Sequence, residues 1–257
     1  MKGYILRWNP KISSWTEDRH EALMEDLKYN DCAEMNWSIY DFEDLEEGDF
    51  FILQQVGTDS DGIAMTGFFS SDAYPDESWK RKDGTSLFYA DMYVHFMISR
   101  RQRSTKTDGK KIHILEENIG KYIPKTFIMD AESLEKKFPD IQWHKGHSGV
   151  LIPQNLLEPL VLELCLQMFQ LEKPSENIAF HGRKTLWQKC CDYINACCPE
   201  MRKKIIGDCA AKTVYENYSP GESIDNDLIE IAFDKEKIKA GSPKSLAEFT
   251  EYLLPKA

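Results

Sequence analysis

The sequence predicts an α+β protein, in which a twisted β-barrel with flanking helices is followed by a small, mainly helical domain. Short runs rich in β-branched and aromatic residues occupy the first part of the chain, and longer helical patterns occupy the end. A polar, proline-bearing break, KPSEN (173–177), separates the two patterns. We therefore expect two domains, at residues 1–172 and 173–257.

The first part of the chain alternates strand and turn signals. YILRWNP (4–10) predicts a strand that a proline ends, and Ser14 or Thr16 can cap the helix that follows. FFILQQV and IAMTGFFSS flank the turn cluster GTDSDG, which predicts a hairpin over residues 50–71. Within that hairpin, Gly67 indicates a bulge or the close approach of another group.

A long strand is expected at residues 85–99, TSLFYADMYVHFMIS. Its residues alternate between an apolar side and a side of mixed aromatic and polar character. The apolar side carries Phe88, Ala90, Met92, Val94 and Phe96, and the mixed side carries Leu87, Tyr89, Asp91, Tyr93 and His95.

The remaining segments read as helices. A short helix is expected near Asp130, and apolar residues at helical spacing predict a longer one at 153–172, although it contains Pro159 near its first turn. Further helices are expected in the second domain. They are RKTLWQKCCDYINACC (183–198), PEMRKKIIGDCAAKTVYENY (199–218) and SLAEFTEYLL (245–254).

The composition is that of a globular protein in a reducing compartment. The longest apolar run, VLELCLQMF, is too short to span a bilayer, and the first residues lack the pattern of a signal peptide. Seven cysteines, an odd number, do not suggest a framework of disulfides. We expect a cytoplasmic protein without membrane contact.

Charge is spread unevenly along the chain. The formal net charge of −11 argues against a general affinity for nucleic acid. Residues 99–113, the basic segment, nevertheless carry 6 basic and 1 acidic side chains. Such a run is either a solvated loop or a contact for phosphate. The candidate phosphate contacts are Arg100, Arg101, Arg103, Lys106, Lys110 and Lys111.

The stretch IQWHKGHSGVLIP (141–153) concentrates residues that often carry function. It is not a nucleophile elbow, because Val150 occupies the position where G-x-S-x-G requires its last glycine. His144 and His147 could supply two ligands of a metal site, but no further ligand motif accompanies them. The other interpretation is a glycine-permitted bend, which is either structural alone or also directs Trp143, His147 and Ser148 toward a pocket.

Aromatic residues beside loop signals form a second candidate site. Flat ligands such as nucleobases are held by stacking on aromatic faces, yet tryptophans also fill ordinary cores. Both interpretations stay open for Trp8, Trp15, Trp37, Tyr40, Trp79 and Trp143. The cysteines of CC-x5-CC permit a zinc site, but Cys191, Ile194 and Cys198 share a helical stripe with Trp187, which favours core packing.

The order of motifs over about residues 3–153 resembles the EVE and PUA-like superfamily. Gly48 and Asp49 match its GD turn, Gly67 matches its strand glycine, and Tyr74 to Asp76 match its YPD segment. The resemblance implies a small twisted β-barrel with helices around it and a cleft that holds a modified or flipped base. It also implies that Trp8, Trp37 and Trp79 are pocket candidates. The basic segment and the helical tail have no counterpart in that pattern.

We therefore expect a non-catalytic module, without cofactor or metal, that recognises a nucleobase in DNA or RNA and prefers a modified one. The expected ligand-binding residues are Trp8, Trp37, Trp79, Trp143, His147 and Ser148. Two other hypotheses stay open. One is a metal-assisted hydrolase or nuclease that uses His144 and His147, and the other is an adaptor whose helical tail binds a protein partner.

Overall fold

The structure is a computed structural model that describes residues 1–13, 15–40, 42–80, 84–98, 127–144, 146–170, 178–180 and 186–198. Contacts divide the chain into two compact units. The sheet unit comprises Met1–Pro153 and Ser175–Arg183, and the helical unit comprises Gln154–Pro174 and Lys184–Ala257. The long helix at 154–170 thus belongs to the second unit, whereas the domain boundary at residue 172 stays a prediction.

The described elements include both strands and helices, with five consecutive strands between α1 and β7. In the sheet unit they are β1 (Gly3–Trp8), α1 (Glu17–Tyr29), β2 (Ala33–Ile39), β3 (Phe50–Gln55), β4 (Gly62–Phe69), β5 (Tyr74–Lys80), β6 (Ser86–Ile98), β7 (Met129–Asp130), α2 (Ala131–Lys137), β8 (Val150–Leu151) and β9 (Ile178–Ala179). In the helical unit they are α3 (Gln154–Gln170) and α5 (Leu186–Cys197).

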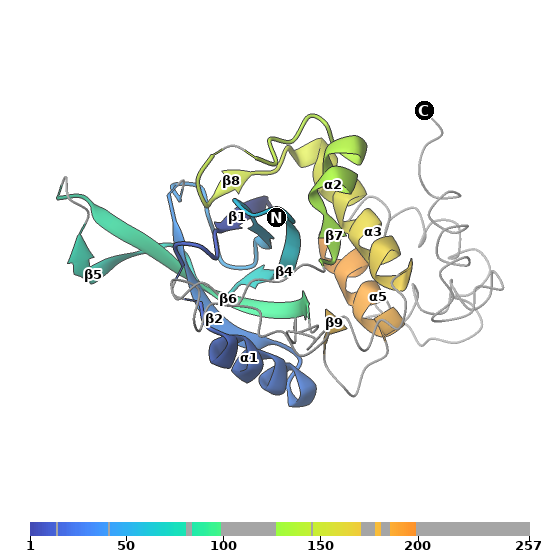
Figure 1. Ribbon diagram of the computed structural model, residues 1–257, viewed down its shortest axis with the longest axis horizontal. Helices are drawn as coiled ribbons and strands as arrows, with labels where there is room; N and C mark the ends of the chain where they lie inside the picture. Colours follow the sequence, from blue (N-terminus) through green and yellow to red (C-terminus); the bar gives the residue numbers. More distant parts are fainter. Residues whose placement is uncertain are drawn as a thin grey trace, which may run out of the picture. The chain divides into compact units, whose positions relative to one another are not determined.

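The described strands form one nine-stranded sheet in a mixed α/β fold (Figure 1). The main path runs β2-β6-β4-β3-β1-β8, while β5 and β9 pair with β6 and β7 pairs with β4. β1 and β3 are parallel, and the other pairs are antiparallel. One backbone bond, from Tyr40 N to Ser148 O at 2.9 Å, links the segment after β2 to the segment before β8. A closed, PUA-like barrel stays a prediction.

The residue pattern explains where each strand lies. In β6 the expected alternation is observed, because Ala90, Met92, Val94 and Phe96 are fully buried while Asp91 and Tyr93 are exposed. β3 is buried at every position, since it lies between β1 and β4 and its sequence, FFILQQ, is apolar on both faces except at its end.

Gly67 allows β4 and β6 to approach closely. The pairing of β4 with β6 shifts its register between Thr66 and Gly67, which is the expected bulge. A Cβ atom at Gly67 would lie 1.9 Å from the carbonyl oxygen of Tyr93. No side chain larger than hydrogen fits there, so both features that the sequence indicated at this position are present.

Local capping sets the starts of α1 and α2. The Thr16 hydroxyl accepts from Arg19 N at 3.3 Å, and the Asp130 carboxylate accepts from Ser133 N at 2.8 Å. These bonds satisfy amide groups that have no partner within the first turn of a helix. Both helices therefore begin where the capping signals predict.

The helical unit is described by α3 and α5, which pack on one another. Cys165 lies 3.9 Å from the carbonyl of Cys190, and Cys198 lies 3.9 Å from that of Glu158. Cys165, Cys190, Cys197 and Cys198 are unbridged and buried. Burial of Ile194 and Cys198 agrees with the predicted core packing, while the side chains of Trp187 and Cys191 lie outside the described residues. Burial raises the pKa of Cys197 and Cys198, so both stay as thiols.

Some predictions lie outside the described residues. They are the helices at 199–218 and 245–254 and the basic segment beyond Ile98. None of the described helices has both the length and the apolar character that a membrane crossing requires.

Candidate functional site

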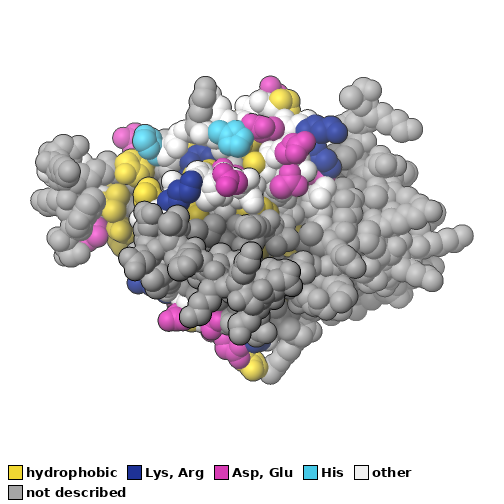
Figure 2. Space-filling view, viewed as in Figure 1, with side chains coloured by type: hydrophobic (Ala, Val, Ile, Leu, Met, Phe, Trp, Pro, Cys, Tyr) yellow, Lys and Arg dark blue, Asp and Glu magenta, His cyan; other side chains and the backbone are white. Residues whose placement is uncertain are grey.

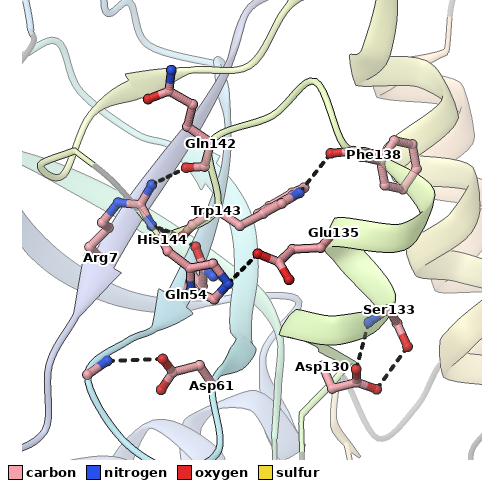
Figure 3. Close-up of polar contacts among 11 residues, drawn as sticks. Arg7, Gln54, Asp61, Asp130, Ser133, Glu135, Phe138, Gln142, Trp143 and His144 are labelled. Carbon is pink, nitrogen blue, oxygen red and sulfur yellow. Dashed lines mark hydrogen bonds and ion pairs between the residues drawn. The ribbon is translucent and has the colours of Figure 1, made fainter.

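Arg7, near the end of β1, holds the bend at residues 142–149 (Figure 3). Its guanidinium donates to Gln54 Oε1 at 2.9 Å, to the carbonyl of Trp143, and to that of Gln142 at 2.6 Å. Burial lowers the pKa of Arg7, but an arginine stays charged at neutral pH. The cation thus orders the chain on either side of the Trp143 ring, whose Nε1 donates to Phe138 O at 2.9 Å.

Ser148 holds the other end of the same bend. Its hydroxyl accepts from Arg7 N at 3.0 Å and donates to Arg7 O at 3.2 Å, and its own carbonyl accepts from Tyr40 N. Gly146 and Gly149 both have φ of +102°, a conformation that favours glycine. The motif is therefore a bend that joins β1 to the end of β2, and a ligand contact by Ser148 stays a prediction.

The two histidines of the motif have different partners. His144 Nε2 lies 2.6 Å from Glu135 Oε1, and both side chains are about half exposed. The exposed His147 ring stacks on Tyr40, with centroids 4.7 Å apart and planes at 22°. Within the described part of the chain, no three or more His, Cys, Asp or Glu side chains are grouped so as to hold a metal ion.

The tryptophans divide into buried and accessible rings. Trp8 and Trp143 are 1% and 2% exposed, so neither presents a face to a ligand in this structure. Trp8 packs edge to face on Trp15, with ring centroids 6.4 Å apart, and Trp15 packs in the same way on Trp37, with centroids 6.2 Å apart. Trp37 is partly exposed and ends this row. Trp79 lies in β5, but its side chain is outside the description.

A cavity of about 530 Å³ opens where this row reaches the surface. We call it the Trp cavity. Its wall combines the start of α1, the strand β2 and one residue of β6, and it includes Trp15, Arg19, Glu34, Asn36, Trp37 and Tyr89. Successive residues of β2 point to opposite faces of the sheet, yet they line the same cavity. This is possible because β2 lies at the end of the main strand path, where the cavity reaches both faces. The result is an aromatic surface bordered by amide, carboxylate and guanidinium groups.

Two hydrogen-bond donors in this wall are unsatisfied. Trp15 Nε1 and Trp37 Nε1 are buried atoms, and neither has a hydrogen-bond partner among the described residues. Buried donors of this kind are uncommon in native proteins. Because both atoms are buried, a ligand in the Trp cavity does not reach them in this structure.

A second cavity, of about 640 Å³, lies on the outer face of the sheet. We call it the Tyr cavity, and it is lined by Asn36, Tyr74, Pro75, Asp76 and Tyr89. Asn36 and Tyr89 belong to both cavities, which are therefore neighbours. Strand pairing assembles the Tyr cavity from β2, β6 and β5, since Tyr74 lies opposite Tyr89 across the β5–β6 pair.

The tyrosines of the second cavity are neutral groups. Burial, followed by a hydrogen bond with Asp91, raises the pKa of Tyr74. Burial, followed by the charge of Asp76, raises the pKa of Tyr89. Both phenols therefore stay protonated beyond the usual range of tyrosine, and their rings keep an electron-rich, uncharged face.

The sequence indicated part of this arrangement. It singled out Trp37, but not Asn36, Tyr74 and Tyr89 as lining residues. The alternation over 85–99 did place Tyr89 and Asp91 on the mixed aromatic and polar side of the strand. That pattern was the available sequence signal for residues on the outer face of the sheet.

The described surface carries charges of both signs. On the face shown in Figure 2, acidic, basic and histidine side chains lie close together among the described residues. The candidate phosphate contacts lie outside the described residues, and their role stays a prediction. They are Arg100, Arg101, Arg103, Lys106, Lys110 and Lys111.

Comparison with known proteins gave two partial structural likenesses. Neither a scan against models of protein families nor a search of curated proteins gave a match. Among solved structures, protein PSPTO5229 from Pseudomonas syringae matches over 36% of this chain and 69% of that one, with 15% identity and a TM-score of 0.25. Human THYN1, solved in complex with DNA containing 5-methylcytosine, matches over 39% and 69%, with 17% identity and a TM-score of 0.27. Likenesses this slight establish neither fold nor function.

Proposed function

We propose that the sheet unit is a non-catalytic module that recognises a nucleobase within nucleic acid, with a modified base as the preferred form. The observation that carries this proposal is the Trp cavity, in which two indole rings meet amide and charged groups at the open edge of β2. Flat, polar rings need that combination of a stacking surface and a few polar contacts.

The size and the walls of the Trp cavity suit one base. Its volume of about 530 Å³ lies within the range of small-molecule sites, about 300–1,000 Å³. Trp37 is the accessible ring of the row, and Trp15 supports it from the inner side at 6.2 Å. Stacking on such a ring contributes about 1–3 kcal/mol for each base.

Polar groups around the ring provide selectivity. The Asn36 amide can donate and accept at once, which suits the edge of a base, while the Glu34 carboxylate accepts from an exocyclic amino group. A buried acceptor or donor without its partner is costly, so these contacts discriminate between bases.

We assign affinity for the phosphate backbone of the nucleic acid to the basic segment. Its six cations stand in a chain of net charge −11, so they supply a local contact for phosphate rather than a general one. Lys110→Ala together with Lys111→Ala should weaken binding to all oligonucleotides equally and lower its dependence on salt.

The test is a binding titration of the full chain with modified and unmodified oligonucleotides at two salt concentrations. We expect Trp37→Ala to weaken binding by about 1–3 kcal/mol, because it removes the stacking surface. Tyr29→Ala is the control, since Tyr29 is 68% exposed at the end of α1, outside the cavity wall. Unchanged affinity of the Trp37 variant would contradict the proposed site, and the absence of binding by the wild-type chain would contradict the function.

A further inference from the structure

The outer face of the sheet carries a pair of tyrosines between two carboxylates. Tyr74 and Tyr89 are cross-strand partners in β5 and β6, so their side chains share a face and are neighbours. Asp91 lies two residues beyond Tyr89 on the same face of β6, and Asp76 lies two residues beyond Tyr74 in β5. The Tyr cavity of about 640 Å³ opens above this arrangement.

Hydrogen bonding holds one side of this pair in place. Tyr74 Oη donates to Asp91 Oδ1 at 2.8 Å, while Asp91 N donates to the hydroxyl of Ser71 at 3.0 Å. Tyr74 is nevertheless 36% exposed, and Tyr89 is partly exposed. The Tyr74 ring is thus oriented in advance, and both rings remain accessible from solvent.

The described charged side chains at this surface are acidic. Among the described residues, the lining of the Tyr cavity contains the Asp76 carboxylate and no lysine or arginine, and Asp91 adds a second carboxylate next to the cavity. Neutral tyrosine rings attract cations through their faces, and nearby carboxylates strengthen that attraction. Phosphate, in contrast, is repelled by the same carboxylates.

We propose that the Tyr cavity binds the guanidinium of an arginine in a basic partner peptide. A guanidinium is flat enough to lie over a tyrosine ring while its N–H groups reach a carboxylate at the edge, which an ammonium does less well. The ligand class therefore differs from that of the Trp cavity, although Asn36 and Tyr89 border both. The site would bring a basic protein segment next to the base that the sheet unit recognises.

The experiment measures binding of the full chain to an arginine-rich peptide, to a lysine peptide of equal charge, and to an oligonucleotide. We expect the arginine peptide to bind more tightly than the lysine peptide, and its affinity to fall with salt. Tyr74→Ala and Asp76→Asn should each weaken it by about tenfold. Tyr93→Ala is the matched control, because Tyr93 is 37% exposed on the same face of β6 but does not line the cavity.

The two cavities are separated by variants that affect only one of them. Asp76 lines only the Tyr cavity and Trp37 only the Trp cavity. We expect Asp76→Asn to keep oligonucleotide binding and Trp37→Ala to keep peptide binding. Equal peptide affinity of the Tyr74 and Tyr93 variants, or no peptide binding by the wild-type chain, would overturn this inference and leave the base site intact. Loss of oligonucleotide binding in the Asp76 variant would assign the Tyr cavity to nucleic acid and overturn it as well.

Discussion

Replacement of Ser148 by alanine tests whether the WHKGHSG bend supports the structure or contacts a ligand. The Ser148 side chain is 7% exposed, and its hydroxyl makes two hydrogen bonds, to the backbone N–H and C=O of Arg7. Alanine removes both bonds and leaves the Arg7 amide without this acceptor. A buried group left unsatisfied costs about 1–3 kcal/mol.

We therefore expect Ser148→Ala to lower the free energy of unfolding by about 2 kcal/mol, a shift of roughly 4–8 °C in Tm for a chain of this size. Circular dichroism during heating measures the shift, and an oligonucleotide titration at low temperature measures binding by the folded variant. Binding should change little, because the Ser148 hydroxyl is already engaged with β1.

Ser38→Ala is the matched control. Ser38 is partly exposed and lines the Trp cavity, so its loss should leave Tm unchanged and weaken base binding instead. An Ser148 variant with normal Tm and impaired binding would refute the structural reasoning and assign the hydroxyl to the ligand.

Two further predictions concern the sheet. Gly67→Ala should lower the free energy of unfolding by about 3 kcal/mol or more, because its Cβ would lie 1.9 Å from Tyr93 O; an unchanged urea midpoint would contradict the close approach. Burial, followed by the charges of Asp49, Asp44 and Glu46, raises the pKa of Tyr4 from 10.0 to about 12. The protonated Tyr4 side chain therefore contributes its full stabilisation below pH 10, and this stabilisation is lost as the pH rises toward 12. Tyr4→Phe should remove about 1.4 kcal/mol of alkaline loss between pH 8 and pH 11, as measured by unfolding at both pH values. Tyr4 Oη has no hydrogen-bond partner among the described residues, so the variant should be as stable as the wild type at pH 8.

Local patterns in the sequence were enough for the elements themselves. The alternation in β6 depends on the two faces of one strand, the start of α1 depends on the Thr16 hydroxyl three residues before Arg19, and the bulge at Gly67 depends on a missing side chain. Each of these signals acts over a few residues. Residues close together in the sequence were therefore sufficient to predict these strands, helix starts and the bulge.

The site required contacts between distant segments. Nothing in the local sequence distinguishes Trp8 and Trp143 from Trp37, because each lies beside a loop signal. Their different exposure follows from what packs against them. The Trp143 ring donates to the Phe138 carbonyl, and the Trp143 carbonyl accepts from Arg7, whereas Trp37 lies in β2, which ends the main strand path.

By itself, the sequence determined that this is an α+β chain with a strand-rich first part, because hydrophobic period and capping are local properties. The tertiary structure alone decided which aromatic rings border a cavity and which polar groups join them. Tyr74, Tyr89 and Asn36 come from three strands and meet only through strand pairing. Exposure is a property of the whole packed sheet, so no single segment can encode it.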